Sequence, residues 1–196
     1  MGQIVVIGGG AAGMMAAGTA AQAGGRVVLL EKNRTLGKKL MITGKGRCNL
    51  TNATEVEEVI SRFGPQGRFL YSALNAFPPV ATQAFFQGRG LKLVIERGQR
   101  VFPVSGEAGD VVRILQEYLQ SEGVVVQHDS PAKGILTSRA REQDGFTLPK
   151  VTGVLLRSGQ SVAADVVILA TGGASYPGTG STGDGYAMAE RLGHTI

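Results

Sequence analysis

The amino-acid sequence predicts an α/β fold, Rossmann-like, in which a central parallel sheet carries an inserted β-meander. First, an apolar strand, a small-residue helix and a second apolar strand follow one another within residues 3–32, the pattern of a right-handed strand–helix–strand unit. Second, a glycine-rich turn joins the first strand to the helix. Third, a hairpin pattern turns at Ser158-Gly159 and leads into an apolar strand over Asp165–Leu169.

The elements follow in order along the chain. "QIVVIG" is the first strand, "AAGMMAAGTAAQAG" the helix and "RVVLLEK" the second strand, since apolar runs of this length suit buried strands. A periodic helix covers 109–123 because Val111, Ile114 and Tyr118 lie on one face, and "VVVQ" after it is expected to be a buried strand. Weaker patterns predict helices over Glu55–Phe63, Pro79–Gln87 and Gly185–Leu192, a strand over 91–96, and a further strand beginning after Leu192.

Composition limits the class of protein. The net charge is +5, but the basic residues are scattered along the chain. Aromatic residues make up 6% of the chain and there is no tryptophan, so few side chains could stack on bases. Together these features predict no nucleic-acid partner. A single cysteine gives no sign of an oxidising compartment. The uncharged run before Arg26 lacks a basic start and contains seven glycines from Gly8 to Gly25, so it predicts neither a signal peptide nor a membrane span. We expect a cytoplasmic protein.

The turn after the first strand carries the spacing Gly8-x-Gly10-x-x-Gly13. In a dinucleotide-binding turn, the first glycine makes the tight bend and the second lets the backbone approach a pyrophosphate. The third lets the helix press against the sheet. Because the triplet here lies between a strand and a helix, as this mechanism requires, it predicts a bound dinucleotide.

Two further features fit such a ligand. The helix begins at Ala11-Ala12-Gly13, where free N–H groups and the positive end of the helix dipole favour an anion. Glu31 ends the second strand, where a carboxylate accepts hydrogen bonds from ribose hydroxyls and repels a 2′-phosphate. Both FAD and NAD use this pattern. FAD is favoured because the site is the first element of the chain and "DVVILATGG" ends like a strand that returns to a flavin nucleotide.

The loop "TGKGRCNLTN" over Thr43–Asn52 is not a P-loop, because the position five before Gly44 is Lys39 and the residue after Lys45 is a glycine. Its glycines let the backbone come close to a ligand, and Arg47 and Asn49 can donate hydrogen bonds. Cys48 has no second cysteine beside it, so we expect it to pack rather than act as a nucleophile. We expect no metal site.

Three segments together resemble the aminoacetone oxidase family of FAD-binding flavoproteins, bacterial proteins often described as NAD(P)/FAD-dependent oxidoreductases. They are "TGKGRCNLTN", "GQRVFPVSGEAGDVV" and "ATGGASYPGTGSTGDGYAMAERLGHTI". Members of that family are about twice as long as this chain. The resemblance therefore implies that residues 1–196 are the FAD-binding domain in the amino-terminal half of a larger two-domain flavoprotein, without its substrate or cap domain and second FAD segment.

The resemblance also assigns cofactor-binding residues by position. They are Gly8, Gly10, Ala11, Ala12 and Gly13 around the pyrophosphate, Glu31 on the ribose, Lys32, Lys38 and Lys39 by the adenosine half, the backbone of Ala132 by the adenine, Gly44, Arg47 and Asn49 beside the flavin ring, and Thr171, Gly172 and Gly173 on the returning strand. Ala132 stands where the family has a valine. Asp184 either acts near the flavin or belongs to a plain turn before the last helix.

The expected function is a flavin-dependent oxidoreductase that transfers a hydride between flavin N5 and a small organic substrate, with NAD(P)H or oxygen as the other redox partner. No residue can be named as the catalytic acid or base. A redox-silent nucleotide-binding module and an NAD-dependent dehydrogenase remain alternatives, and a nucleic-acid-modifying flavoprotein is a weaker one. The sequence leaves the oligomeric state open.

Overall fold

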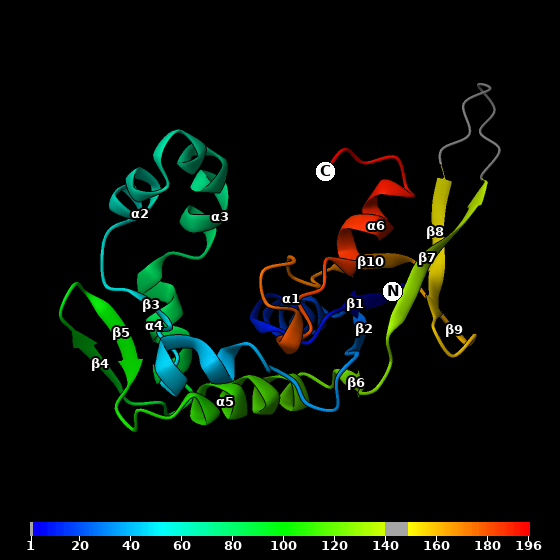
Figure 1. Ribbon diagram of the computed structural model, residues 1–196. Helices are drawn as coiled ribbons and strands as arrows, with labels where there is room; N and C mark the ends of the chain where they lie inside the picture. The colour runs from blue at the N-terminus through cyan, green and yellow to red at the C-terminus, as the bar shows by residue number, and fades with distance from the viewer. Residues whose placement is uncertain (1, 140–148) are drawn as a thin grey trace. The chain divides into compact units, whose positions relative to one another are not determined.

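The computed structural model describes residues 2–139 and 149–196 (Figure 1). Its contacts divide the chain into two compact units. Unit 1 comprises Met1–Lys39 and Leu115–Ile196, and unit 2 comprises Leu40–Ile114. Helix α5 (Ala108–Ser121) contributes residues to both.

Unit 1 is built on a parallel sheet of four strands in the order β10, β1, β2, β6. Their bounds are β1 Gln3–Ile7, β2 Arg26–Leu30, β6 Val125–Gln127 and β10 Val166–Leu169. The central strand β1 carries Val5 and Val6 with no exposed surface, because strands on both sides cover its edges and both its faces are packed. The predicted central parallel sheet is confirmed.

Helix α1 (Ala11–Gln22) connects β1 to β2 and owes its close packing to small residues. A Cβ added at Gly18 would lie 2.1 Å from the ring of Tyr118 in α5, so only a glycine fits beneath that ring. A Cβ added at Gly13 would lie 1.7 Å from the carbonyl oxygen of Gly8. The start of the helix therefore touches the turn that precedes it.

A three-stranded antiparallel meander forms the second sheet of unit 1 (Figure 1), with β7 Ala132–Arg139, β8 Pro149–Leu156 and β9 Ser161–Ala163. Strands β8 and β9 join at the predicted turn, where Gly159 N–H donates to the Leu156 carbonyl at 3.1 Å. The meander and helix α6 (Asp184–Glu190) share one apolar core with the parallel sheet. This core contains Val5, Ile7, Leu30, Ala132, Val154, Leu156, Ala164 and Met188.

Unit 2 combines a small antiparallel sheet in the order β3, β5, β4 with short helices. The strands are β3 Thr51–Asn52, β4 Leu93–Glu96 and β5 Arg100–Pro103. The helices are α2 Val56–Arg62, α3 Tyr71–Ala76 and α4 Pro79–Gln87, with 3₁₀ segments η1 Leu40–Gly46 and η2 Gly64–Leu70. A further 3₁₀ segment, η3 Pro177–Thr179, belongs to unit 1.

Two sequence-based expectations are wrong. The strand over 124–127 was expected to be buried, but Val125 in β6 is 55% exposed because β6 is the edge strand of its sheet. Residues 193–196 form no strand, because no described strand pairs with them. The sequence also missed β3, β5 and β7, whose residues show no clear alternation.

Gly13→Ala should lower the free energy of unfolding by about 3 kcal/mol, because the new methyl group must displace the Gly8 carbonyl. Urea denaturation measures this. Gly134→Ala is the matched control, since a Cβ there meets no atom within 4 Å, and its effect should be small. A Gly13→Ala variant as stable as wild type would contradict the packing described.

Candidate functional site

The three positions of the turn are occupied by glycine for different physical reasons. Gly8 has φ +111°, and a Cβ there would lie 2.5 Å from the Ala170 carbonyl oxygen, so the fold itself requires glycine. The same holds for Gly13. Gly10 has φ −80°, which any residue adopts, and a Cβ added there meets nothing within 4 Å. The packing of the described residues therefore gives no reason for glycine at position 10.

The amino terminus of α1 is open to an anion. The first hydrogen bond of the helix runs from Met14 N–H to the Gly10 carbonyl at 2.9 Å. The N–H groups of Ala11, Ala12 and Gly13, which come before it, therefore have no partner within the helix. Gly10 offers no capping side chain, and the first turn carries no acidic residue. Ala11 and Ala12 are exposed. These donors and the helix dipole favour a negative charge outside the turn.

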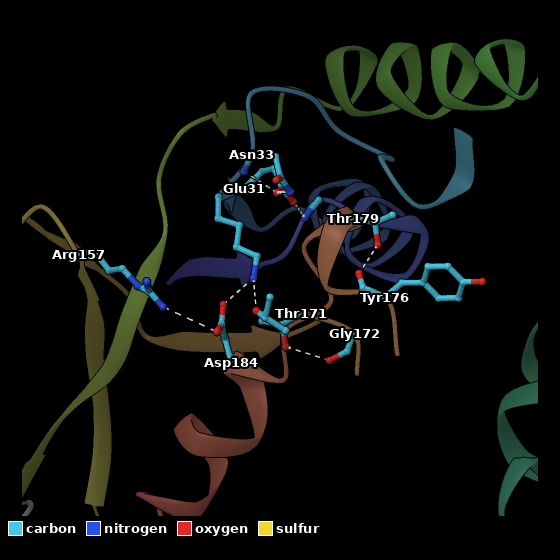
Figure 2. A network of polar contacts seen from close by, with 11 residues as sticks. Glu31, Asn33, Arg157, Thr171, Gly172, Tyr176, Thr179 and Asp184 are labelled. Carbon is cyan, nitrogen blue, oxygen red and sulfur yellow. Dashed lines mark hydrogen bonds and ion pairs between the residues drawn. The ribbon is translucent and has the colours of Figure 1, made fainter. Parts of the chain in front are cut away.

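Glu31 follows β2 and is only 6% exposed. One carboxylate oxygen accepts from Gly9 N–H at 2.6 Å, and the other accepts from the backbone N–H and side-chain amide of Asn33 at 2.7 and 2.5 Å (Figure 2). A carboxylate offers about four acceptor positions, so these three bonds leave room for about one more. Glu31 thus ties the end of β2 to the glycine turn.

Lys32 holds the start of α6. Its ammonium group donates to Asp184 Oδ2 and Thr182 Oγ1, each at 2.6 Å. Arg157 lies 3.8 Å from the other Asp184 oxygen (Figure 2). The hydrogen bond from Lys32 holds the pKa of Asp184 below its ordinary value, against the opposing effect of burial. Lys32, expected by the adenosine half, is thus engaged in an ion pair within the chain.

The other two lysines expected near the adenosine half, Lys38 and Lys39, lie in different surroundings. Lys39 donates to the Ser175 hydroxyl at 3.1 Å, and its ammonium lies 5.3 Å from the centre of the Tyr176 ring. Lys38 is exposed. Lys39 therefore connects the segment after β2 to the segment after β10.

The returning segment lies directly beside the glycine turn. Ala170 N–H donates to the Ile7 carbonyl at 2.9 Å, and a Cβ at Gly8 would lie 3.0 Å from the Thr171 Cα. Gly172 needs its glycine because its φ is +72°. The Gly173 carbonyl accepts from Gly183 N–H at 3.2 Å. The structure thus brings the predicted pyrophosphate turn and the predicted returning strand together.

Ala132 begins β7, and its side chain is buried in the core. It also borders a cavity of about 460 Å³ between β7, the β8–β9 turn and α6. The lining residues are Ala132, Lys133, Arg157, Asp184, Ala187, Met188 and Arg191. The sequence predicted a ligand contact only for the backbone of Ala132, and burial of its side chain in the core is compatible with that prediction.

The predicted flavin-ring residues Gly44, Arg47 and Asn49 belong to unit 2. Arg47 donates to Glu96 at 2.7 Å and stacks on Phe102 with its guanidinium carbon 4.1 Å from the ring centre. The Asn49 amide donates to the carbonyls of Thr51 and Val101 at 2.9 and 3.0 Å. Both side chains, expected to donate to a flavin, thus donate to neighbours within unit 2.

Cys48 is 2% exposed, and burial raises the pKa of its thiol despite a hydrogen bond with Thr43. A raised pKa disfavours the reactive thiolate, which supports a packing role.

Sequence reasoning missed Asn33, Thr182 and Ser175, which hold Glu31, Lys32 and Lys39. The only available signal was that Asn33 follows Glu31 by two positions, since Thr182 and Ser175 lie far along the chain. Within residues 2–139 and 149–196, His, Cys, Asp and Glu side chains form no group of three or more suited to a metal ion. None of the helices in these ranges has the length and apolar character needed to span a membrane.

A parallel sheet with this glycine turn and an acidic residue after the second strand defines a Rossmann-type dinucleotide-binding domain. Residues 2–196 match the family model described as HI0933-like protein Rossmann domain, so the chain belongs to that family. This family is related to flavoprotein oxidoreductases. The narrower aminoacetone oxidase resemblance stays a prediction.

Among curated proteins, the chain is 36% identical over 198 residues to the 3-dehydro-bile acid delta(4,6)-reductase of Clostridium scindens, covering 100% of this chain and 45% of the relative. It is 30% identical over 192 residues to the ribosomal RNA dihydrouridine synthase of Escherichia coli, covering 98% of this chain and 44% of the relative. The chain thus spans less than half the length of these relatives.

Two solved structures share the fold. A flavocytochrome c3 fumarate reductase aligns with a TM-score of 0.71 at 22% identity, covering 97% of this chain and 40% of the other. The 3-ketosteroid delta1-dehydrogenase of Sterolibacterium denitrificans aligns with a TM-score of 0.69 at 15% identity, covering 97% of this chain and 54% of the other. The Rossmann-like fold class is confirmed.

Asp184→Asn should lower the free energy of unfolding at pH 7 by about 0.5–1 kcal/mol, because Lys32 loses a charged partner. The lowered pKa of Asp184 means that its contribution is present above about pH 4 and is lost as the pH falls through the folded-state value. Urea denaturation from pH 7 to pH 2.5 should therefore show the difference from wild type shrinking below about pH 4. Glu190→Gln, an exposed change on the same helix, is the control, and a difference independent of pH would contradict this assignment.

Proposed function

We propose that this chain is the FAD-binding part of a flavin-dependent oxidoreductase that transfers a hydride between flavin N5 and an organic substrate. The observation that carries the proposal is the unexplained glycine at position 10. Gly8 and Gly13 are required by contacts within the chain, whereas Gly10 has neither a positive φ nor a crowded Cβ position. A glycine there is explained by a ligand that approaches the backbone.

The surrounding residues fit the diphosphate and ribose of FAD. The N–H groups of Ala11, Ala12 and Gly13 can donate to the diphosphate, and the remaining acceptor position of Glu31 can meet a ribose hydroxyl. Thr171 and the glycines after it lie beside the same turn. All of these groups belong to unit 1, so one unit carries the proposed adenosine and diphosphate site.

Bound FAD would supply the hydride chemistry, and the chain would bind and orient it. We keep Gly44, Arg47 and Asn49 as the proposed residues beside the flavin ring. Arg47 has five N–H donors, and its bond to Glu96 uses one of them. A cation beside the flavin would stabilise its reduced, anionic form. Arg47 therefore keeps further donors for a flavin, whereas the two N–H groups of the Asn49 amide already donate to Thr51 and Val101, so Asn49 would have to exchange one of these bonds.

The first candidate substrate is a small organic molecule, with NAD(P)H as the proposed electron donor. The name of the Clostridium scindens relative, a bile acid reductase, supports this substrate class. The chain covers 45% and 44% of these relatives, which supports the proposal that it is one domain of a longer flavoprotein. We further propose that residues 1–196 are its amino-terminal FAD-binding domain and that the protein is bacterial and cytoplasmic.

The second candidate substrate is a base in RNA. The Escherichia coli relative is named a ribosomal RNA dihydrouridine synthase. The specific observation that favours this candidate is a group of exposed aromatic side chains in unit 2, including Phe69 at 90% exposure. Either substrate would receive its hydride from the same cofactor.

Gly10→Ala should weaken FAD binding at least about tenfold while changing the free energy of unfolding by less than about 0.5 kcal/mol. The methyl group meets no protein atom but lies at the backbone expected to approach the diphosphate. Quenching of FAD fluorescence measures the Kd, and urea denaturation measures the stability.

Gly134→Ala is the control for this comparison, because its added methyl group is equally unhindered. Unchanged FAD binding in Gly10→Ala would remove the main support for the proposal. A melting temperature that rises with NAD and not with FAD would favour an NAD-dependent dehydrogenase instead.

A further inference from the structure

Asn33 holds the carboxylate of Glu31 in one orientation. Its backbone N–H and its side-chain amide both donate to Oε1 of Glu31, at 2.7 and 2.5 Å (Figure 2). The other oxygen, Oε2, accepts from Gly9 N–H at 2.6 Å. A carboxylate oxygen offers two acceptor positions, so the two bonds from Asn33 fill Oε1. The position that remains free is therefore on Oε2, the oxygen bonded to the glycine turn.

Asn33 orients this carboxylate without neutralising its charge. All three donors to Glu31 are neutral N–H groups. Among the described residues, no ion pair includes Glu31. A lysine or arginine could also hold the carboxylate, but it would offset the negative charge that strengthens a hydrogen bond from a ligand hydroxyl. With an amide as its partner, Glu31 is fixed in place and stays a strong acceptor.

The chain also fixes Asn33 itself. Its carbonyl accepts from Asp129 N–H at 3.3 Å. Gly180, which follows η3, lies against its side chain, because a Cβ added at Gly180 would be 2.7 Å from Asn33 Nδ2. The amide therefore touches the carboxylate of Glu31 and also a segment almost 150 residues further along the chain. These contacts restrict the rotation of the side chain that holds Glu31.

We propose that Asn33 is a positioning residue for the adenosine ribose. By filling Oε1 of Glu31, it leaves Oε2 to accept a hydrogen bond from one ribose hydroxyl and leaves no acceptor position for the second hydroxyl. The inference rests on the proposed function, because it takes the ligand to be FAD. It goes beyond that function by giving Asn33 a role and by fixing how many ribose hydroxyls Glu31 binds.

A purely structural role for Asn33 would have a different consequence. If Asn33 only closed the turn after β2, its loss would lower the stability of the chain and weaken all ligands in the same proportion. A positioning residue instead changes the preference for a ligand that has the hydroxyl over one that lacks it. The ratio of the two Kd values for one variant therefore separates the two roles.

The first test measures the displacement of FAD from the 196-residue chain by ADP, 2′-deoxy-ADP and 3′-deoxy-ADP, followed by FAD fluorescence. In the unmodified chain, loss of one hydroxyl should raise the Kd at least about tenfold, because it removes a hydrogen bond to a charged acceptor. Loss of the other hydroxyl should change the Kd less than about threefold. Asn33→Ala should reduce the larger preference to less than about threefold as well, because Glu31 is no longer held in place.

Ser130→Ala is the control for Asn33→Ala. The Ser130 hydroxyl donates to the His128 carbonyl at 2.9 Å, and its backbone N–H donates to the Glu31 carbonyl at 2.9 Å. The substitution therefore removes a polar side chain beside the same strand end without touching the Glu31 carboxylate. It should keep the full preference.

The second test reaches Asn33 from the other side. In Gly180→Ala, the new methyl group displaces the Asn33 amide, so the preference should again fall below about threefold. Gly159→Ala is the matched control, because its φ of +91° is close to the +96° of Gly180 while a Cβ there meets no atom within 4 Å. It introduces similar backbone strain and should keep the preference. Circular dichroism checks that each variant is folded, and Gly180→Ala decides alone if Asn33→Ala does not fold.

An unchanged preference in the folded Asn33→Ala or Gly180→Ala variant would overturn the inference. So would an unmodified chain in which both deoxy analogues bind more weakly than ADP, or neither does, and so would ADP that fails to displace FAD. The proposed function fails separately, if the chain does not bind FAD. Calorimetry with ADP and its two analogues then measures the same preference directly. A chain that loses FAD in Gly10→Ala but shows no preference contradicts only the role of Asn33.

Discussion

The close contact between the start of α1 and the turn before it is the constraint on which unit 1 depends. Because a Cβ added at Gly13 would lie only 1.7 Å from the Gly8 carbonyl oxygen, no other residue lets the helix begin where it does. Gly8 is in turn pressed against Ala170, which follows β10. One turn therefore sets the positions of α1, β1 and the returning segment, and it aims the free N–H groups of α1 at the same point outside the sheet.

Polar contacts complete this arrangement from the other strands. Glu31 draws the end of β2 to Gly9, Lys32 binds the start of α6, and Lys39 reaches Ser175. Each contact joins a residue near β2 to a segment distant in sequence, apart from the local bonds of Asn33. The carboxyl end of the sheet is thus held by hydrogen bonds and ion pairs, while its body is held by the apolar core shared with the meander.

Much of unit 1 could be predicted because its signals are local. The strand–helix–strand unit, the glycine spacing and the turn at Ser158-Gly159 each depend on neighbouring residues, and the structure confirms these elements. The exposure of β6 could not be predicted, because an apolar run does not reveal which strand stands at the edge of a sheet. The partners of Lys32 and Lys39 lie more than 130 residues away, so no local pattern pointed to them. In unit 2, the exposed aromatic side chains Phe63, Phe69 and Tyr71 could not be found from the whole-chain aromatic content, because a composition does not say where along the chain residues lie.

The most direct test of the central claim is a titration of the ¹⁵N-labelled chain with FAD, followed by amide chemical shifts in two-dimensional ¹H–¹⁵N NMR spectra. If the turn binds the diphosphate, the largest shifts fall on the amides of Gly10, Ala11, Ala12 and Gly13, which form the cap and the first turn of α1. Saturating FAD that leaves these four amides unmoved would contradict the account.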